Sequence, residues 1–276
     1  MKKDQFIIAY LPDLDATETV VSHALHMARM LSKGLILLHI CDPKYSPLTT
    51  GEAEQRLKSL QQTLPSGVTA SYAALKGATA QVVDALPTLL GAVVIVAQVV
   101  PRARRGSAMG RRAILKNFAG SRAAFLVVQQ PLTDASQTAD VATIVDFKKE
   151  SKDKFIWSSY FPRFGGSTMH ILYYDYKDEF LRSKWYANMT QLTKLYTELG
   201  VSFQPHPIDS GSTYADVNAL RYAAAHNIGM LIAVTTKERD GLEFFIGTQE
   251  QRTIVNKFRI PILFLNPRED LYVLCD

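Results

Sequence analysis

The sequence is poor in cysteine and has no cysteine-based motif. Its two cysteines, Cys41 and Cys275, lie far apart and do not form a Cys-x-x-Cys pair. Their scarcity argues against a disulfide-stapled secreted domain and against a structural zinc site, and it favours a reducing compartment. We therefore expect a cytoplasmic protein, and we predict no metal site.

Long apolar runs and a strong charge of one sign are also missing. No stretch approaches the ~18 apolar residues that a membrane helix needs, and the first apolar run is too short for a secretory signal. Lysine and arginine number 31 against 26 acidic residues, which gives a net charge of +5 over 276 residues. This mild excess does not by itself argue for a nucleic acid as the partner, and the missing apolar run argues against a membrane.

Motifs of common enzymes are absent as well. The sequence contains no Gly-x-Ser-x-Gly, no His-Glu-x-x-His, no P-loop and no paired set of catalytic carboxylates. His23, His26 and His39 lie near one another, but no second ligand motif joins them, so we expect core or surface histidines. His206 stands between two prolines, which indicates a rigid loop. The sequence therefore predicts a protein that is not an enzyme.

In the first half of the chain, short apolar runs alternate with helical patterns. The predicted strands are Phe6–Tyr10, Leu35–Ile40, Val68–Leu75, Val93–Val96 and Phe125–Val128. The predicted helices are Thr17–Leu31, Glu52–Leu64, Ala78–Leu90 and Arg112–Ala119. Such alternation indicates a parallel sheet with helices on both faces, whose ligands bind beyond the carboxyl ends of the strands.

The second half repeats the first. Asp13, Asp42 and Gly67 recur 133 residues later as Asp146, Asp175 and Gly200, and Gly110 and Leu126 recur 137 residues later as Gly247 and Leu263. The repeated strands are predicted at Val141–Asp146, His170–Tyr174, Val201–Gln204, Met230–Val234 and Ile262–Leu265. The repeated helices are predicted at Ser151–Phe161, Ser183–Leu199 and Tyr214–His226. The polar, turn-rich segment 131–140 between the halves is the predicted linker.

The stretch Gly241–Pro267 predicts a tight loop, a helix and a final strand. Gly247 permits a sharp turn, and the hydroxyl of Thr248 can cap the helix that follows. That helix is predicted to carry Ile254, Val255 and Phe258 on one face and to end at Pro261. A glycine and a hydroxyl residue that open a helix present free backbone N–H groups, which suits a phosphate.

This stretch resembles the closing third of a universal stress protein domain, and with the repeat the resemblance covers nearly the whole chain. It implies an α/β protein of two tandem domains, 1–132 and 140–276. Each would have an open five-stranded parallel sheet of the Rossmann-like, adenine nucleotide alpha-hydrolase-like type. The last strands, Phe125–Val128 and Ile262–Leu265, would pair around a pseudo-twofold axis as an intrachain pseudo-dimer, which would cover two apolar edges.

The resemblance also implies a site for ATP or AMP. Asp13 (or Asp15) and Asp146 stand where the family places an aspartate against the adenosine. The alternative for each is that it caps the next helix. In the first half, Gly110 would open the phosphate-binding helix, with Arg111 in place of the usual hydroxyl residue. Gly120-Ser121 also fits the family's spacing, but it lies too close to the next strand.

The second half keeps more of the expected site. Gly241, Gly247 and Thr248 stand in the places of the phosphate loop, although the glycine expected directly after the fourth strand is missing from both halves. We therefore expect a non-enzymatic universal stress response protein that binds ATP, AMP or another small ligand in its second domain. The alternative is a structural or protein-interaction module that has lost nucleotide binding.

Five arginines cluster between the fourth strand and the last helix of the first half. They are Arg102, Arg104, Arg105, Arg111 and Arg112. One interpretation is an anion site at a helix N-terminus. The other is a solvated loop, which we favour because runs of charge usually face solvent.

Overall fold

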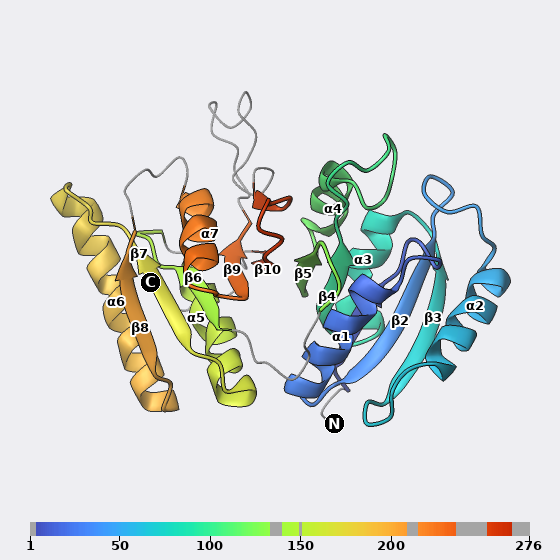
Figure 1. Cartoon of the computed structure of the whole chain (residues 1–276), viewed down its shortest axis with the longest axis horizontal. Coiled ribbons are helices and arrows are strands. Elements are labelled where there is room, and N and C mark those ends of the chain that lie inside the picture. Colours follow the sequence, from blue (N-terminus) through green and yellow to red (C-terminus); the bar gives the residue numbers. More distant parts are fainter. Residues whose placement is uncertain (1–3, 133–139, 149–150, 209–214, 236–252, 267–276) are drawn as a thin grey trace. The chain divides into compact units, whose positions relative to one another are not determined.

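The computed structural model describes residues 4–132, 140–148, 151–208, 215–235 and 253–266 (Figure 1). The chain forms two compact units, Met1–Ala135 (unit 1) and Ser136–Asp276 (unit 2). The predicted pairing between the last strands of the two halves concerns their relative placement, so it stays a prediction.

Unit 1 is an open α/β sandwich with a parallel sheet in the order β3-β2-β1-β4-β5. Its strands are β1 (Phe6–Tyr10), β2 (Gly34–Cys41), β3 (Ala70–Lys76), β4 (Ala92–Gln98) and β5 (Ala124–Val128). Its helices are α1 (Glu18–Met30), α2 (Thr50–Gln62), α3 (Thr79–Leu89) and α4 (Arg111–Phe118). Right-handed crossovers put α1 and α2 on one face of the sheet and α3 and α4 on the other.

Local chemistry fixes the ends of these elements, and apolar burial fixes their packing. Thr49 and Glu52 form a capping box that starts α2. Tyr10 at the end of β1 packs edge-on against Phe118 of α4, with ring centroids 5.6 Å apart, and Phe118 in turn contacts Phe125 of β5. These three aromatic rings belong to the buried core between the sheet and α4.

Unit 2 has the same strand order, β8-β7-β6-β9-β10, again in parallel. Its strands are β6 (Val141–Ile144), β7 (Met169–Tyr173), β8 (Phe203–Pro207), β9 (Met230–Val234) and β10 (Ile262–Leu265). Its helices are α5 (Ser151–Tyr160), the π-helical turn η1 (Phe161–Gly165), α6 (Glu179–Leu199) and α7 (Ala215–Ala225). The predicted fold class, a five-stranded parallel sheet with helices in each half, is confirmed.

The predicted helix over Ile254–Phe258 is wrong. Thr253 is the last helical residue there, and residues 254–260 form bends and turns before β10. The Asn256 side chain accepts a hydrogen bond from the Ile260 N–H and donates one to the Ile260 carbonyl, each 3.0 Å long. An asparagine that bonds the nearby backbone in this way competes with the helix, and Arg259 in the left-handed region completes the turn.

The predicted loop around His206 is wrong too, because this residue lies within β8. That strand is at the edge of the sheet and pairs only with β7 among the described strands of unit 2. The Ile208 N–H bonds to the Tyr173 carbonyl, so alternate N–H groups of β8 face β7. Pro205 and Pro207 take the positions whose N–H would face away, where a proline removes no ladder bond.

A search of the described helices for one that is both long enough and apolar enough to cross a membrane finds none.

Candidate functional site

Asp13 and Asp146 lie directly beyond β1 and β6, at the carboxyl edges of the two sheets. The Asp13 carboxylate accepts a hydrogen bond from the Asp15 N–H at 2.9 Å, and Asp146 accepts the equivalent bond from the Lys148 N–H at 3.1 Å. The N-cap of α1 is Thr17, so Asp13 does not cap that helix. Asp15 instead faces solvent and pairs with Arg56 at 3.1 Å. Both units therefore place an aspartate at the same turn.

The predicted phosphate-loop residues are divided between described and undescribed parts of the chain. Gly110 is the N-cap of α4 and Arg111 its first residue, which confirms that the last helix of unit 1 opens there and not at Gly120. The side chain of Arg111 is exposed. Gly241, Gly247 and Thr248 lie outside the described residues, so their expected role stays a prediction.

The carboxyl edge of unit 1 is closed by its own hydrogen bonds. The buried Asp42 carboxylate, just after β2, accepts bonds of 2.8 Å from both the N–H and the hydroxyl of Thr79, at the start of α3. Burial alone would raise the pKa of Asp42, but these bonds and one from the Lys44 N–H lower it below its ordinary value. The N-terminus of α3 therefore already holds an anion that belongs to the protein.

His39 joins two loops at the same edge. Its Nδ1 lies 2.7 Å from the Leu11 carbonyl oxygen and its Nε2 lies 2.8 Å from the Ser46 hydroxyl. Because a carbonyl can only accept, Nδ1 carries the proton and Nε2 accepts from the serine. Burial lowers the pKa of His39, so the ring is neutral. This is the structural histidine that the sequence predicts, with both nitrogens satisfied.

The carboxyl edge of unit 2 is less complete. Lys154 of α5 is 6% exposed, and its ammonium donates to the Ile144 carbonyl at the end of β6. Tyr174, directly after β7, is 4% exposed, and its hydroxyl has no hydrogen-bond partner among the described residues. Burial, reinforced by the negative charges of Asp216 and Asp146, raises the pKa of Tyr174. At this edge the buried Tyr174 hydroxyl thus lacks a hydrogen-bond partner among the described residues, and the buried Lys154 ammonium donates to a backbone carbonyl.

The turn that carries Asp146 is held in place from α6. The Asn188 side-chain amide donates to the carbonyl oxygens of Asp146 and Lys148, at 2.8 and 2.9 Å. An amide that bridges two carbonyls fixes the backbone of the turn, and so fixes where the aspartate lies. We refer to Asp146, Lys154, Tyr174 and Asn188 together as the unit 2 edge.

Sequence reasoning missed Lys154, Tyr174 and Asn188. The predicted repeat carried a signal for two of them. The residue 133 positions before Lys154 is the buried Val21, and the residue 133 positions before Tyr174 is the buried Cys41. A lysine and a tyrosine in unit 2 thus replace apolar or weakly polar residues of unit 1. The register that predicts the repeat could also have revealed this difference between the two units.

The five clustered arginines are all exposed, as the solvated interpretation expects. Their loop is nevertheless built from defined turns, in which the Val100 N–H bonds to the Met109 carbonyl at 2.9 Å and the Ser107 N–H to the Arg104 carbonyl at 3.0 Å. Gly106, the third residue of the turn from Arg104 to Ser107, has a φ of 88°, which a side chain would strain. Arg102, Arg104 and Arg105 thus project from an ordered loop, and Arg111 and Arg112 project from the first turn of α4.

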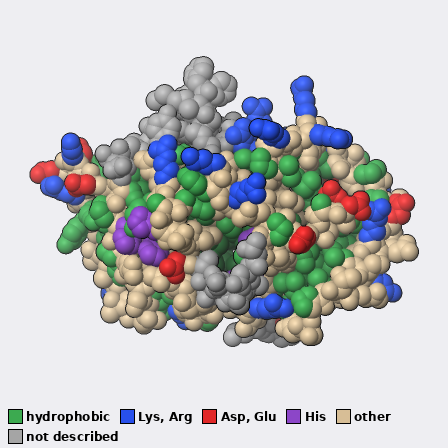
Figure 2. Space-filling model, in the orientation of Figure 1, with side chains coloured by type: hydrophobic (Ala, Val, Ile, Leu, Met, Phe, Trp, Pro, Cys, Tyr) green, Lys and Arg blue, Asp and Glu red, His purple; other side chains and the backbone are tan. Residues whose placement is uncertain are grey.

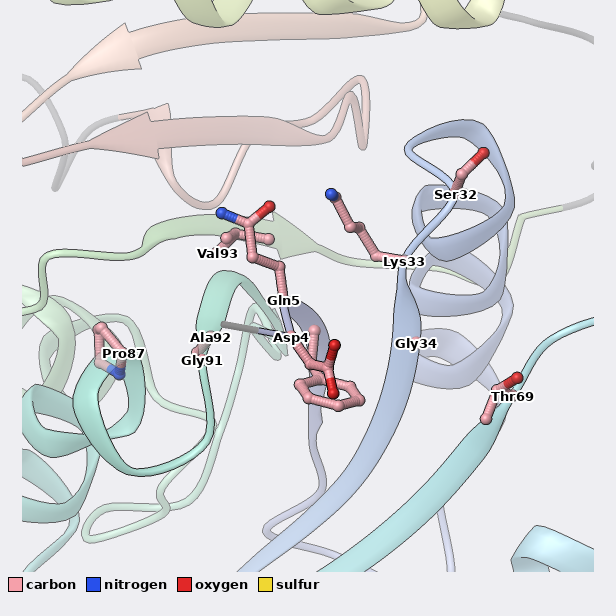
Figure 3. Close-up of a pocket in the computed structure, with 11 residues that line it drawn as sticks. Asp4, Gln5, Ser32, Lys33, Gly34, Thr69, Pro87, Gly91, Ala92 and Val93 are labelled. Atoms are coloured by element: carbon pink, nitrogen blue, oxygen red, sulfur yellow. The ribbon is translucent and has the colours of Figure 1, made fainter. Parts of the chain in front are cut away.

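A pocket of about 760 Å³ opens at the opposite, amino edge of unit 1 (Figure 3). Its walls come from the starts of β1, β2 and β4, and Figure 3 shows the Lys33 and Gln5 side chains extending to one side of it. Ligands of open α/β sheets bind at the carboxyl ends of the strands. This pocket is therefore not the expected nucleotide site.

The comparisons with known proteins agree with the fold. No family model and no curated protein matches the sequence. Among solved structures, a universal stress protein from Archaeoglobus fulgidus is 12% identical, has a TM-score of 0.65, and matches over 96% of this chain and 97% of its own. A Pseudomonas aeruginosa protein assigned to the universal stress proteins is 14% identical and has a TM-score of 0.66. The match covers 98% of this chain and 96% of that protein's chain. The fold is that of universal stress proteins.

The same fold also occurs in another setting. The cytoplasmic domain of a prokaryotic cation chloride cotransporter is 12% identical to this chain and has a TM-score of 0.56, and 99% of each chain is covered. Identities this low establish the fold and leave function to the site.

Proposed function

We propose that this chain is a tandem universal stress protein, formed by duplication of one domain, that binds an adenine nucleotide, ATP or AMP, in unit 2. The equal strand order of the two units and the matching turns at Asp13 and Asp146 support the duplication. The likeness to universal stress proteins over nearly the full length supports the family.

The unit 2 edge is the observation that carries the binding proposal. A buried ammonium is costly unless an anion accompanies it, and a buried hydroxyl is costly unless it is hydrogen-bonded. Lys154 and Tyr174 lie buried at the ends of β6 and β7 with few described partners. A ligand that carries phosphate and hydroxyl groups supplies the counter-charge and the acceptor that these two side chains need.

Unit 1 supports the choice of unit 2 by contrast. Its α3 N-terminus is already occupied by the Asp42 carboxylate, and Arg111 replaces the hydroxyl that would open α4. An anion at the N-terminus of α3 would have to displace the hydrogen bonds between Thr79 and Asp42. We therefore propose one nucleotide site per chain.

We further propose that the protein acts without catalysing a reaction, in the cytoplasm, by binding its ligand and contacting other proteins. The sequence contains no known motif that pairs a nucleophile with a base, and this supports a role without catalysis. Purified protein incubated with ATP and Mg²⁺ is expected to release no phosphate above the buffer rate.

Isothermal titration with ATP and with AMP tests the binding. The wild-type chain is expected to bind one nucleotide, and mass spectrometry of the freshly purified protein is expected to detect nucleotide carried through purification. Asp146→Ala should weaken binding at least tenfold, about 1.4 kcal/mol. Asp13→Ala is the matched control, because Asp13 forms the same turn in unit 1, and it should leave the affinity unchanged.

The absence of heat with either nucleotide at millimolar concentration would refute nucleotide binding. Equal losses in the two variants would refute the assignment to unit 2. The first result would favour the alternative, a tandem module that works through protein contacts alone. The cotransporter domain, a cytoplasmic part of a larger protein, shares this fold.

A further inference from the structure

Three of the six histidines lie together in unit 2, where Figure 2 shows a group of histidine side chains (purple) at the surface. His170 of β7 and His206 of β8 come from neighbouring strands, and their ring planes are tilted by 27° with centroids 5.1 Å apart. Nδ1 of His170 lies 3.0 Å from Nε2 of His206. Two imidazole nitrogens thus face each other at short range.

A carboxylate fixes the orientation of one of these rings. Asp140, directly before β6, places Oδ2 at 3.4 Å from Nε2 of His170, and its Oδ1 accepts a bond of 2.8 Å from the Thr168 N–H. A carboxylate accepts, so Nε2 of His170 is assigned the proton and Nδ1 keeps its lone pair. The His206 Nε2–H then donates to that lone pair.

In metal sites, one nitrogen of a histidine ring commonly donates its N–H to a carboxylate, and the other nitrogen gives its lone pair to the metal. The carboxylate fixes the orientation of the ring. Two nitrogen ligands at about 2.1 Å from one metal, at angles of 90° to 109°, lie about 3.0 to 3.4 Å apart. The observed separation of 3.0 Å is at the short end of that range. From this geometry we propose that His170 and His206 bind a divalent transition metal of the class that imidazole prefers: Zn²⁺, Ni²⁺ or Cu²⁺.

The metal replaces the proton that Nε2 of His206 donates to Nδ1 of His170. Nδ1 of His170 and Nε2 of His206 each give a lone pair to the metal, and the His206 proton moves to Nδ1 of the same ring. Both imidazoles stay neutral, and Asp140 keeps its bond from His170. Among the described residues no three histidine, cysteine, aspartate or glutamate side chains surround one point, so water completes the coordination of the metal.

The site is separate from the unit 2 edge. Asp140 precedes β6 and His170 is the second residue of β7, so both lie toward the amino ends of the strands, whereas Asp146 follows β6. The aromatic ring of Tyr222 of α7 lies between His206 and the exposed His226, with centroids 5.3 and 3.9 Å away. Tyr222 of α7 thus contacts the histidine pair through His206, and His226, just after α7, lies on the other side of the Tyr222 ring. The proposal therefore does not rest on nucleotide binding.

Unit 1 has no counterpart of this pair. In the repeat register, His170 corresponds to Leu37 and Leu172 to His39. His206 is paired with Leu172 in unit 2, and Ala74 is paired with His39 in unit 1, so Ala74 is the counterpart of His206. Leu37 is buried and Ala74 carries no ligand atom in its side chain. A metal bound by this chain at its histidine pair is thus a property of unit 2 alone.

The untagged full chain, freed of metal and nucleotide, tests this proposal at pH 7.5. Titration with Cu²⁺, Ni²⁺ and Zn²⁺ in turn is expected to show one saturable site. The electron paramagnetic resonance spectrum of the Cu²⁺ complex is expected to show coupling to two imidazole nitrogens. His206→Ala should abolish binding at the metal concentration that half-saturates the wild type. Asp140→Asn should weaken binding about 10- to 100-fold.

His26→Ala is the control, since His26 lies on α1 of unit 1, and it should bind metal as the wild type does. Thermal melting of each variant shows whether it is folded. The spectrum of the wild-type Cu²⁺ complex tests the proposal even where a variant fails to fold. Absence of saturable binding of all three metals up to millimolar concentration would overturn the proposal. A His206→Ala protein that binds as tightly as the wild type, or a spectrum with a single nitrogen ligand, would overturn it equally.

Discussion

His23 should make unit 1 sensitive to acid. It lies on α1, is 6% exposed, and its Nε2 donates to the Gln130 carbonyl at 3.1 Å. Burial lowers the pKa of His23 to about 4, helped slightly by His26 and opposed by the bond to Gln130. The ordinary value is 6.5. In the unfolded chain the ring is free to take up a proton near that ordinary value.

The sign follows from proton uptake. Between pH 6.5 and 4 the unfolded state binds a proton on His23 that the folded state does not, so the free energy of unfolding falls as the pH falls. The stabilising contribution is fully present above pH 6.5. The full difference of about 2.5 pKa units corresponds to roughly 3 kcal/mol, and about 2 kcal/mol of it is lost by pH 5.

The variant His23→Gln isolates this contribution, because the glutamine amide can still donate to the Gln130 carbonyl but does not titrate. Urea unfolding of both proteins at pH 7.5 and pH 5 should show a loss for the wild type that exceeds the loss for the variant by about 2 kcal/mol. Nuclear magnetic resonance of the histidine rings should give a pKa near 4 for the signal that the variant lacks. Equal losses in the two proteins, or a His23 pKa near 6.5, would refute the reasoning.

Three further predictions test the packing and the unit 2 edge. Gly91→Ala should lower the free energy of unfolding by at least about 2 kcal/mol, because Gly91 has a φ of 64° and a Cβ there would lie 2.2 Å from a backbone oxygen. The control Gly51→Ala, in open space on α2, should cost nothing, and thermal melting compares the two. Asp42→Ala should cost about 3 kcal/mol in urea unfolding by leaving Thr79 without an acceptor, and Asp42→Asn, which keeps one acceptor oxygen, should cost less. Lys154→Met should leave the melting temperature equal or higher while weakening nucleotide binding at least tenfold; a strongly destabilised variant would show that the buried ammonium serves the fold instead.

The apolar pattern of the chain specified its strands well. The bounds of β1, β9 and β10 agree with the sequence prediction at every residue. Short apolar runs of this kind are buried on both faces of a parallel sheet, so a local pattern is enough to find them. The error at Ile254–Phe258 arose because helical spacing was present, yet the bonds from Asn256 to Ile260 outweighed it.

By itself, the sequence predicted the class of fold, the same order of strands in each half of the chain and the position of an aspartate beyond the first strand of each half. These features depend on residue types in a local or repeated order. Only the tertiary structure decided that Lys154 and Tyr174 are buried, and that His170 meets His206 across 36 positions of the chain. Burial and contacts between strands depend on which segments fold side by side, and no local pattern encodes the distance between two atoms on different strands.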